Sequence, residues 1–246
     1  MEERLRGGIN EVVRRGGRVH RPARPWSDSV QALLAHVRAA GFPGVPAPHG
    51  RDLDGGEVLE WIDGAVGDEM QAMPREVLDE VGRMLRAYHD ATLGFDPSDR
   101  NWQFPAGEPA EVILHGDPAP YNCVFRAGRP VAWIDFDTAR PGPRIWDVAD
   151  AAYRFGLGPF DLQPLMPAHA ERVRWLVDGY GLSSDGRGEL AATIVERLRW
   201  LAALIEERAA AGDVAFASHL ADGHADLYRR HAAAVEGSPA LAPALA

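Results

Sequence analysis

The stretch "LHGDPAPYNC", residues 114–123, places a histidine, an aspartate and an asparagine in one short loop. A glycine and two prolines lie between these polar residues, and the prolines exclude a regular helix. His115, Asp117 and Asn122 follow the pattern H-G-D-x-x-x-x-N. A loop held open in this way can direct several polar groups toward one ligand.

A predicted hairpin, "CVFRAGRPVAWIDFD", begins directly after this loop and has its turn at Ala127-Gly128. One strand leaves the loop after Asn122, and the other strand returns to end at Asp135. Because the strands run side by side, we expect these two residues at the same end of the hairpin. Both would then face the loop that holds Asp117.

The residue types gathered there suit phosphoryl transfer. The amide oxygen of Asn122 and the carboxylate of Asp135 are hard ligands of the kind that Mg²⁺ prefers. The Asp117 carboxylate can take a proton from a hydroxyl and aim that hydroxyl at phosphorus. Asp137, on the same side of the strand as Asp135, is expected to share the metal, to contact the substrate, or to be a solvated turn residue. Each residue alone has a simpler interpretation as a turn or cap, but the combination is more specific.

The segments "HGDPAPYN" and "IDFDTARPGPRIWDVA" resemble the catalytic loop and metal-binding segment of the aminoglycoside phosphotransferase family, relatives of protein kinases that include choline kinases. The resemblance runs from the first predicted hairpin to about residue 230. It implies that Asp117 is the catalytic base and that Asn122 and Asp135 are the metal ligands. It also implies supporting roles for His115, which would order the loop, and Asp147, which would tie a helix start to it.

The resemblance further implies a site for ATP, or for GTP as the alternative nucleotide, in the N-terminal part. Relatives hold the phosphates with a glycine-bearing hairpin and with a strand lysine that pairs with a carboxylate on the first helix. Here the hairpin offers Gly7-Gly8, residues 1–61 contain no lysine, and Arg21 stands where the lysine is expected. Arginine is a planar fork and not a point charge, so this exchange is not conservative. Arg21 is expected either to contact phosphate or to be a surface strand residue.

The segment "EVLEWIDG", residues 57–64, is predicted to be a hinge strand, where backbone groups of Glu60 and Ile62 would bind adenine. The predicted fold is α+β and two-lobed, as in protein kinases. Residues 1–63 would form a small, reduced β-rich nucleotide-binding lobe. Residues 64–246 would form a larger, mainly helical lobe with the catalytic loop, the metal-binding hairpin and the acceptor pocket.

Local patterns predict the main elements of both parts. A hairpin is expected with its turn at Gly16-Gly17, followed by a helix from Ser27, as N-cap, to Gly41. A second helix is expected over 74–92. The chain from about 146 to 234 is expected to be helical, with interruptions at 156–167 and 181–188. Residues 153–164 are interpreted as a lid, and the tail 237–246 as frayed.

Composition narrows the class of protein. The chain has 246 residues, a net charge of −10 and one cysteine, Cys123. The charge argues against a nucleic-acid partner and suits a cationic small substrate. The single thiol gives neither an internal disulfide nor a structural zinc site. The sequence has no apolar run of about 20 residues and no signal peptide, so we expect no membrane partner and a cytoplasmic location. It does not indicate an oligomeric state.

The leading hypothesis is an ATP- and Mg²⁺-dependent phosphotransferase that acts on a hydroxyl group of a small molecule, the acceptor. The first alternative is a nucleotide-binding or regulatory pseudokinase, because the N-terminal part lacks both the lysine and a helix glutamate. A metal-dependent hydrolase using His115 is the third possibility, and a single histidine makes it the weakest.

Overall fold

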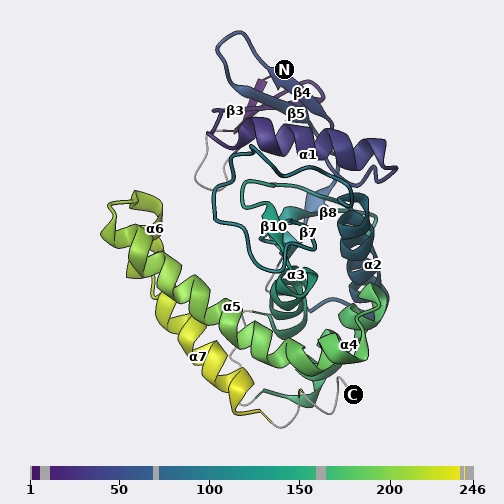
Figure 1. Cartoon of the computed structure of the whole chain (residues 1–246), viewed down its shortest axis with the longest axis vertical. Coiled ribbons are helices and arrows are strands. Elements are labelled where there is room, and N and C mark those ends of the chain that lie inside the picture. The colour runs from purple at the N-terminus through teal and green to yellow at the C-terminus, as the bar shows by residue number, and fades with distance from the viewer. Residues whose placement is uncertain (1, 6–11, 69–71, 159–164, 239–240, 242–246) are drawn as a thin grey trace. The chain divides into compact units, whose positions relative to one another are not determined.

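The computed structural model describes residues 2–5, 12–68, 72–158, 165–238 and 241 (Figure 1). The chain divides into two compact units. Unit 1 comprises residues 1–68 and 83–147, and unit 2 comprises residues 69–82 and 148–246. This division follows contacts within the chain and does not test the lobe boundary at residue 63, which stays a prediction.

Unit 1 contains an antiparallel sheet with the strand order β1-β2-β3-β5-β4. The strands span Glu2–Leu5 (β1), Val12–Arg15 (β2), Arg18–Arg21 (β3), Pro48–Arg51 (β4) and Glu57–Glu60 (β5). The turn between β2 and β3 confirms the hairpin predicted at Gly16-Gly17, where Gly16 has a φ of +61°. The pairing of β3 with β5 sets Arg21 opposite Glu57. Gly7-Gly8 lie outside the described residues.

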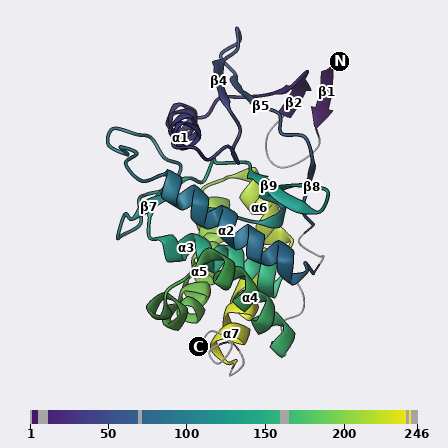
Figure 2. The same cartoon turned by 90° about the vertical axis from the view of Figure 1, so that its right-hand side faces the viewer.

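Helix α1, Ser27–Ala39, lies against β4 (Figure 2). Its predicted apolar positions are all buried: Val30, Leu33, Leu34 and Val37. The prediction that Ser27 is the N-cap is wrong, because Trp26 occupies the cap position and Ser27 is the first helical residue. The Ser27 hydroxyl instead accepts from the Arg24 N–H at 3.0 Å and donates to the Glu57 carboxylate at 3.3 Å.

Two smaller sheets of unit 1 frame the loop at 115–122. Strands β6 (Ala65–Val66), β8 (Cys123–Arg126) and β9 (Arg129–Trp133) form one, and β7 (Val112–Leu114) pairs with β10 (Arg140–Gly142) in the other. The hairpin β8–β9 has the predicted turn at Ala127-Gly128. Asn122 and Asp135 do lie at the same end of it, because Cys123 pairs with Trp133 and the Ile134 N–H donates to the Asn122 carbonyl at 2.9 Å.

Helix α2, Arg75–Ala91, is the helix predicted over 74–92, and its apolar stripe is buried as expected. Its first part belongs to unit 2 and its second part, from Arg83, to unit 1. In unit 1 the α2 residue Tyr88 lies against Phe136, with ring centroids 5.5 Å apart, and Phe136 lies 4.5 Å from the His115 ring. These aromatic contacts form the core directly beneath the loop.

Unit 2 is helical. Its elements are α3 (Arg144–Ala151, which begins in unit 1), a π-helical turn η2 (Ala152–Leu157), α4 (Pro167–Tyr180), α5 (Ser184–Ala210), α6 (Val214–Ala221) and α7 (His224–Glu236). Helices α5 and α7 lie side by side (Figure 1). The predicted interruption at 181–188 is shorter, because Ser183 caps α5 through a hydrogen bond from the Gly186 N–H. The breaks at Gly212 and Gly223 were not predicted.

Two glycines allow α2 and α4 to approach closely within unit 2. A Cβ at Gly82 would collide with the Leu176 backbone, and a Cβ at Gly179 would collide with the Asp79 backbone. Among the described residues, no helix is both long and apolar enough to cross a bilayer. The second half of the predicted lid, residues 159–164, and most of the predicted frayed tail lie outside the described residues.

Candidate functional site

Asp147, in the first turn of α3, holds the start of the predicted catalytic loop, residues 115–122. Its carboxylate accepts from the His115 N–H at 2.7 Å and from the Gly116 N–H at 3.0 Å, and His89 Nε2 lies 3.0 Å away. Burial opposes ionisation, but the hydrogen bonds from His89 and the His115 N–H hold the pKa of Asp147 below its usual range. Gly116 has a φ of +87° and no room for a Cβ beside Thr138, so glycine is needed there.

The His115 ring is fully buried and its hydrogen bonds select one tautomer. Nδ1 accepts from the Asp117 N–H at 3.3 Å, so that nitrogen carries no proton. Nε2 therefore carries the proton and donates to the Ile134 carbonyl at 2.9 Å. His115 thus connects the loop at 115–122 to the hairpin end that carries Asp135, and its loop-ordering role stays a prediction.

Both carboxylate oxygens of Asp117 accept hydrogen bonds from the loop itself. The Tyr121 hydroxyl donates to Oδ1 at 3.0 Å, and Asn122 Nδ2 donates to Oδ2 at 3.0 Å. Asn122 Nδ2 also donates to the Asp117 carbonyl at 3.0 Å. Because the Asn122 amide nitrogen faces these acceptors, its Oδ1 stays available as a metal ligand. The role of Tyr121 was not predicted, although a phenol directly before a predicted ligand was a visible signal.

Asp135 occupies an unusual backbone conformation at the end of the hairpin, with a φ of +62°. Left-handed backbone at a non-glycine residue costs free energy and is concentrated at functional sites. Removal from bulk water and the neighbouring Asp137 and Asp117 carboxylates raise the pKa of Asp135 to about 6, against the opposing charge of Arg21.

Arg21 extends from β3 to three carboxylates. Its Nε donates to Glu57 at 2.7 Å, Nη2 donates to Asp137 at 2.6 Å, and Nη1 lies 3.4 Å from Asp135. Burial opposes the charge, but Asp137, Glu57 and Asp135 raise the pKa of Arg21 above its usual range. The surface interpretation of Arg21 is therefore wrong, since only 8% of its side chain is exposed. Contact with phosphate stays a prediction.

Glu57 is the carboxylate that pairs with Arg21, whereas relatives of the family were expected to carry this carboxylate on the first helix. It lies on β5, is fully buried, and also accepts from the Ser27 hydroxyl and from Gln31 Nε2 at 3.4 Å. The helix α1 thus contributes polar donors, and the acid comes from the strand. A glutamate in the otherwise apolar strand "EVLE" was the available signal, because a buried carboxylate needs a partner.

The predicted adenine contacts lie at the end of β5. The Glu60 N–H already donates to the Ala47 carbonyl at 2.8 Å, so this donor is used within the protein. The half-buried Ile62 follows the strand, and its contact with adenine stays a prediction. Trp61 is not in the buried core: the Arg14 guanidinium stacks over its ring at 4.3 Å.

The donor set fits a hard divalent cation. Asn122 and Asp135 offer an amide oxygen and a half-exposed carboxylate, and the charges of Asp117 and Asp137 act on Asp135. One guanidinium faces this excess of negative charge, which a cation would relieve. Across the described ranges, no group of three or more His, Cys, Asp and Glu side chains is arranged to hold a metal by itself. The set therefore suits Mg²⁺ that completes its shell with water and phosphate.

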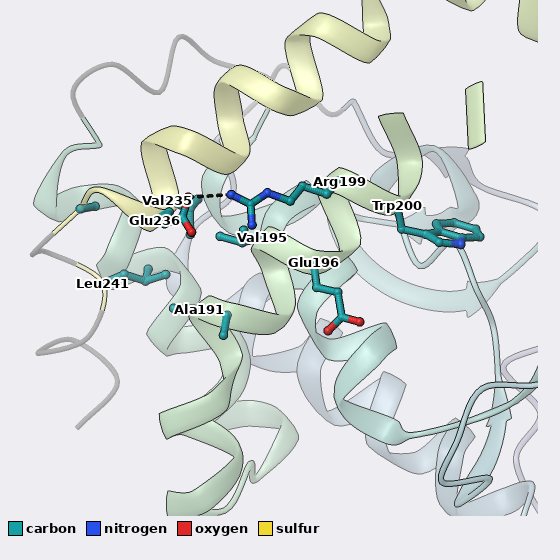
Figure 3. A pocket seen from close by; sticks show the side chains of 10 residues that line it. Ala191, Val195, Glu196, Arg199, Trp200, Val235, Glu236 and Leu241 are labelled. Atoms are coloured by element: carbon teal, nitrogen blue, oxygen red, sulfur yellow. Dashed lines mark hydrogen bonds and ion pairs between the residues drawn. The ribbon is translucent and has the colours of Figure 1, made fainter. Parts of the chain in front are cut away.

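A cavity of about 670 Å³ lies between α5 and α7 in unit 2, and none of the predicted site residues lines it (Figure 3). Arg199 and Glu236 form an ion pair of 2.7 Å at its wall. The cavity has no carboxylate cluster like that of unit 1, since its lining is mainly Ala, Val, Leu and Trp with Glu196 and this pair. We therefore do not include this cavity in the candidate functional site.

Comparison with known proteins shows which proteins this chain resembles. The sequence profile of the phosphotransferase enzyme family matches residues 99–174. The trifolitoxin immunity protein of Rhizobium leguminosarum bv. trifolii is 38% identical over 203 residues, which cover 74% of this chain and 74% of that protein. The matched range of the family profile includes the loop at 115–122.

Solved structures with the same fold are more distant in sequence. A choline/ethanolamine kinase family protein from Mesorhizobium loti has a TM-score of 0.66 at 18% identity and covers 100% of this chain and 91% of its own. An aminoglycoside phosphotransferase from Alicyclobacillus acidocaldarius has a TM-score of 0.62 at 16% identity and covers 99% and 91%. A ternary complex with streptomycin and ATP has a TM-score of 0.60 at 13% identity and covers 93% of both. They confirm the predicted α+β, protein-kinase-like fold, and the chain belongs to the phosphotransferase enzyme family.

Proposed function

We propose that this protein transfers the γ-phosphoryl group of Mg²⁺-bound ATP to a hydroxyl group of a small molecule. The observation that carries this proposal is the Asp117 carboxylate, held by Tyr121 and Asn122 at the hairpin end that also presents Asp135. Asp117 would accept the proton of the acceptor hydroxyl as its oxygen attacks phosphorus. The residues would position the reactants and need no covalent intermediate.

Asn122 and Asp135 would hold the metal, with Asp137 as a further ligand or substrate contact. Bound Mg²⁺ would supply neutralisation of the phosphate charge. The chain's own part is to present an amide oxygen and a carboxylate at one hairpin end, which the Ile134–Asn122 backbone hydrogen bond supports. Arg21 would contact phosphate after leaving part of its carboxylate pairing, and the Glu60 and Ile62 backbone would face adenine.

The acceptor class follows from charge and from the relatives. The net charge of −10 favours a cationic molecule. The relative that is 38% identical is named an immunity protein, and one structural neighbour was solved with streptomycin and ATP. We propose a toxic small molecule as the acceptor, phosphorylated in the cytoplasm.

The alternative of a nucleotide-binding pseudokinase keeps one specific observation in its favour. The sequence contains no lysine, so the usual lysine contact to the phosphates is missing, and Arg21, which stands at that position, is already held by three carboxylates. A protein of this kind would bind nucleotide without transferring phosphate.

The test is ATP consumption across aminoglycosides, choline, homoserine, sugars and nucleosides. We expect turnover with at least one acceptor and a loss of about 100-fold or more in kcat for Asp117→Asn. Asp28→Asn, at a side chain that is 84% exposed on α1, is the matched control and should keep full activity. Mg²⁺-ATP binding without any turnover would favour the pseudokinase, and unchanged turnover in Asp117→Asn would remove the assigned base.

A further inference from the structure

The hydroxyl of Tyr121 is positioned to control the orientation of the Asp117 carboxylate. It donates to Asp117 Oδ1 at 3.0 Å, while Asn122 Nδ2 donates to Oδ2 at 3.0 Å. Each oxygen of the carboxylate therefore has one donor from within the loop. A carboxylate has about four lone-pair sites, so both oxygens keep capacity for an acceptor hydroxyl.

The backbone around Tyr121 is fixed by hydrogen bonds on both sides. Tyr121 is the middle residue of a short 3₁₀ turn, Pro120–Asn122. The Asn122 N–H donates to the Ala119 carbonyl at 3.0 Å, and the Pro120 carbonyl accepts from the Gly67 N–H at 2.9 Å. A Cβ at Gly67 would collide with Pro120, so β6 and the turn are in close contact. The backbone that carries the Tyr121 phenol is therefore held by hydrogen bonds on both sides.

The two residues that donate to the Asp117 carboxylate, Tyr121 and Asn122, differ in their other predicted roles. Asn122 is also a predicted metal ligand, so its amide would contact the metal as well as Asp117. Tyr121 is half-buried and has no predicted part in metal binding, and its hydroxyl reaches the other oxygen of the carboxylate. Removing this hydroxyl would free the carboxylate to rotate about the Asn122 contact. Even a small rotation of the carboxylate lowers the fraction of time in which the reactants are correctly oriented.

We propose that Tyr121 is a positioning residue for phosphoryl transfer: it fixes the Asp117 carboxylate so that one oxygen faces the acceptor hydroxyl. This inference rests on the proposed function. In the step, the acceptor O–H bond breaks and its proton passes to Asp117. The acceptor oxygen forms the new bond to phosphorus, and ADP leaves with the bridging oxygen. Tyr121 keeps its own proton throughout and acts only through Asp117.

The experiment compares Tyr121→Phe with the wild-type protein. With the acceptor found in the screen, we expect kcat to fall about 10-fold and the KM for ATP to change less than about two-fold, because the nucleotide contacts are untouched. The second readout is the carboxyl ¹³C resonance of Asp117 in protein labelled at aspartate, assigned by its loss in Asp117→Asn. This resonance should move in Tyr121→Phe, because the carboxylate loses a donor.

Tyr228→Phe is the matched control. The Tyr228 hydroxyl accepts from Arg154 Nη2 at 3.1 Å within unit 2, so this variant also removes one hydrogen-bonded phenol oxygen. It should leave both kcat and the Asp117 resonance unchanged. The thermal unfolding of both variants is measured first, so that a loss of folded protein is not mistaken for a loss of positioning.

The outcomes separate this inference from the proposed function. An unchanged kcat, or an unmoved Asp117 resonance, in folded Tyr121→Phe overturns the role of Tyr121 while wild-type turnover still supports the phosphotransferase. If the wild-type protein transfers phosphate to no acceptor, the proposed function fails, and the resonance alone decides whether Tyr121 sets the carboxylate. Because the resonance can be recorded without nucleotide or acceptor, it tests the contact in either case.

Discussion

At the scale of single residues, the site is defined by carboxylates that lie close to one another. Asp135 has a left-handed backbone, a half-exposed side chain and the charges of Asp137 and Asp117 acting on it. Such an arrangement is unfavourable without a cation, and proteins keep it where a function requires it. Arg21 supplies part of the missing charge. If a divalent cation binds here as proposed, it would compete with this guanidinium for the same carboxylates.

The pH dependence of stability tests the charge on Asp135. Its pKa in the folded protein is about 6, above its usual value, so protonation stabilises the fold at low pH and this contribution is lost as pH rises from about 4 through 6. Asp135→Asn cannot titrate. We expect the free energy of unfolding of the variant, relative to wild type, to rise by about 1 kcal/mol between pH 4 and 7.5, a value kept small because the side chain is half-exposed.

Denaturant unfolding at the two pH values measures this difference without added metal. Asparagine tolerates a left-handed backbone nearly as well as aspartate, so the substitution changes the charge with little added strain. A relative stability that is the same at pH 4 and pH 7.5 would contradict the raised pKa.

Arg21 is predicted to compete with Mg²⁺ for the carboxylates. A lysine at this position keeps the charge but cannot bond to Glu57 and Asp137 with a planar fork. Arg21→Lys should therefore bind Mg²⁺ alone several-fold more tightly, about 3- to 10-fold, in calorimetric titration without nucleotide. In the same variant the KM for ATP should rise if Arg21 makes the predicted phosphate contact, because lysine cannot reproduce the planar fork. Equal Mg²⁺ affinity in both proteins would show that the guanidinium does not obstruct the metal site.

At the scale of elements, the sequence predicted those parts whose signals are local. The turn residues Gly16-Gly17 and Ala127-Gly128 predicted the two hairpins, and the hairpin β8–β9 places Asn122 and Asp135 at the same end. Strand β10, "RPG", was missed because proline and glycine are typical of turns; its partner β7 is distant in the sequence. The pairing of Arg21 with Glu57 was missed for the same reason, because only the β3–β5 register reveals it.

The hydrogen bonds that join Asp147 of α3 to the loop at 115–122 are expected to stabilise the folded protein. Asp147 is fully buried, accepts from two backbone N–H groups and faces His89. The Asp147→Asn substitution would replace one acceptor oxygen with an amide N–H₂ that points toward donors, leaving buried groups unpaired. We expect this variant to lower the free energy of unfolding by about 3 kcal/mol, and the melting temperature by about 6 to 12 °C for a chain of this size.

Differential scanning calorimetry of Asp147→Asn and Asp28→Asn checks this value. Asp28 pairs with Arg51 at the surface, so the same chemical change there should cost less than about 0.5 kcal/mol. Similar melting temperatures for both variants would show that the Asp147 hydrogen bonds do not hold the loop.

At the scale of the whole molecule, every predicted site residue belongs to unit 1. The α5–α7 pair belongs to unit 2 and has a hydrophobic cluster of its own with α6, formed by Ala202, Ile205, Ala225, Phe216 and Tyr228. Ligand binding stabilises the parts of a protein that must be folded to form the site. Nucleotide should therefore protect the two units unequally, whether the protein is an active phosphotransferase or only binds nucleotide.

Hydrogen exchange with and without Mg²⁺-ATP measures this difference. At a free nucleotide concentration of about 100 times Kd, linkage gives about 2.7 kcal/mol of stabilisation. We expect the added protection in β3, β5 and residues 115–137, and little of it in α5 and α7. Asp135→Asn should remove the part of the protection that depends on Mg²⁺ and leave any metal-independent part. Equal added protection in α5 and in residues 115–137 would contradict the expected difference between the two units.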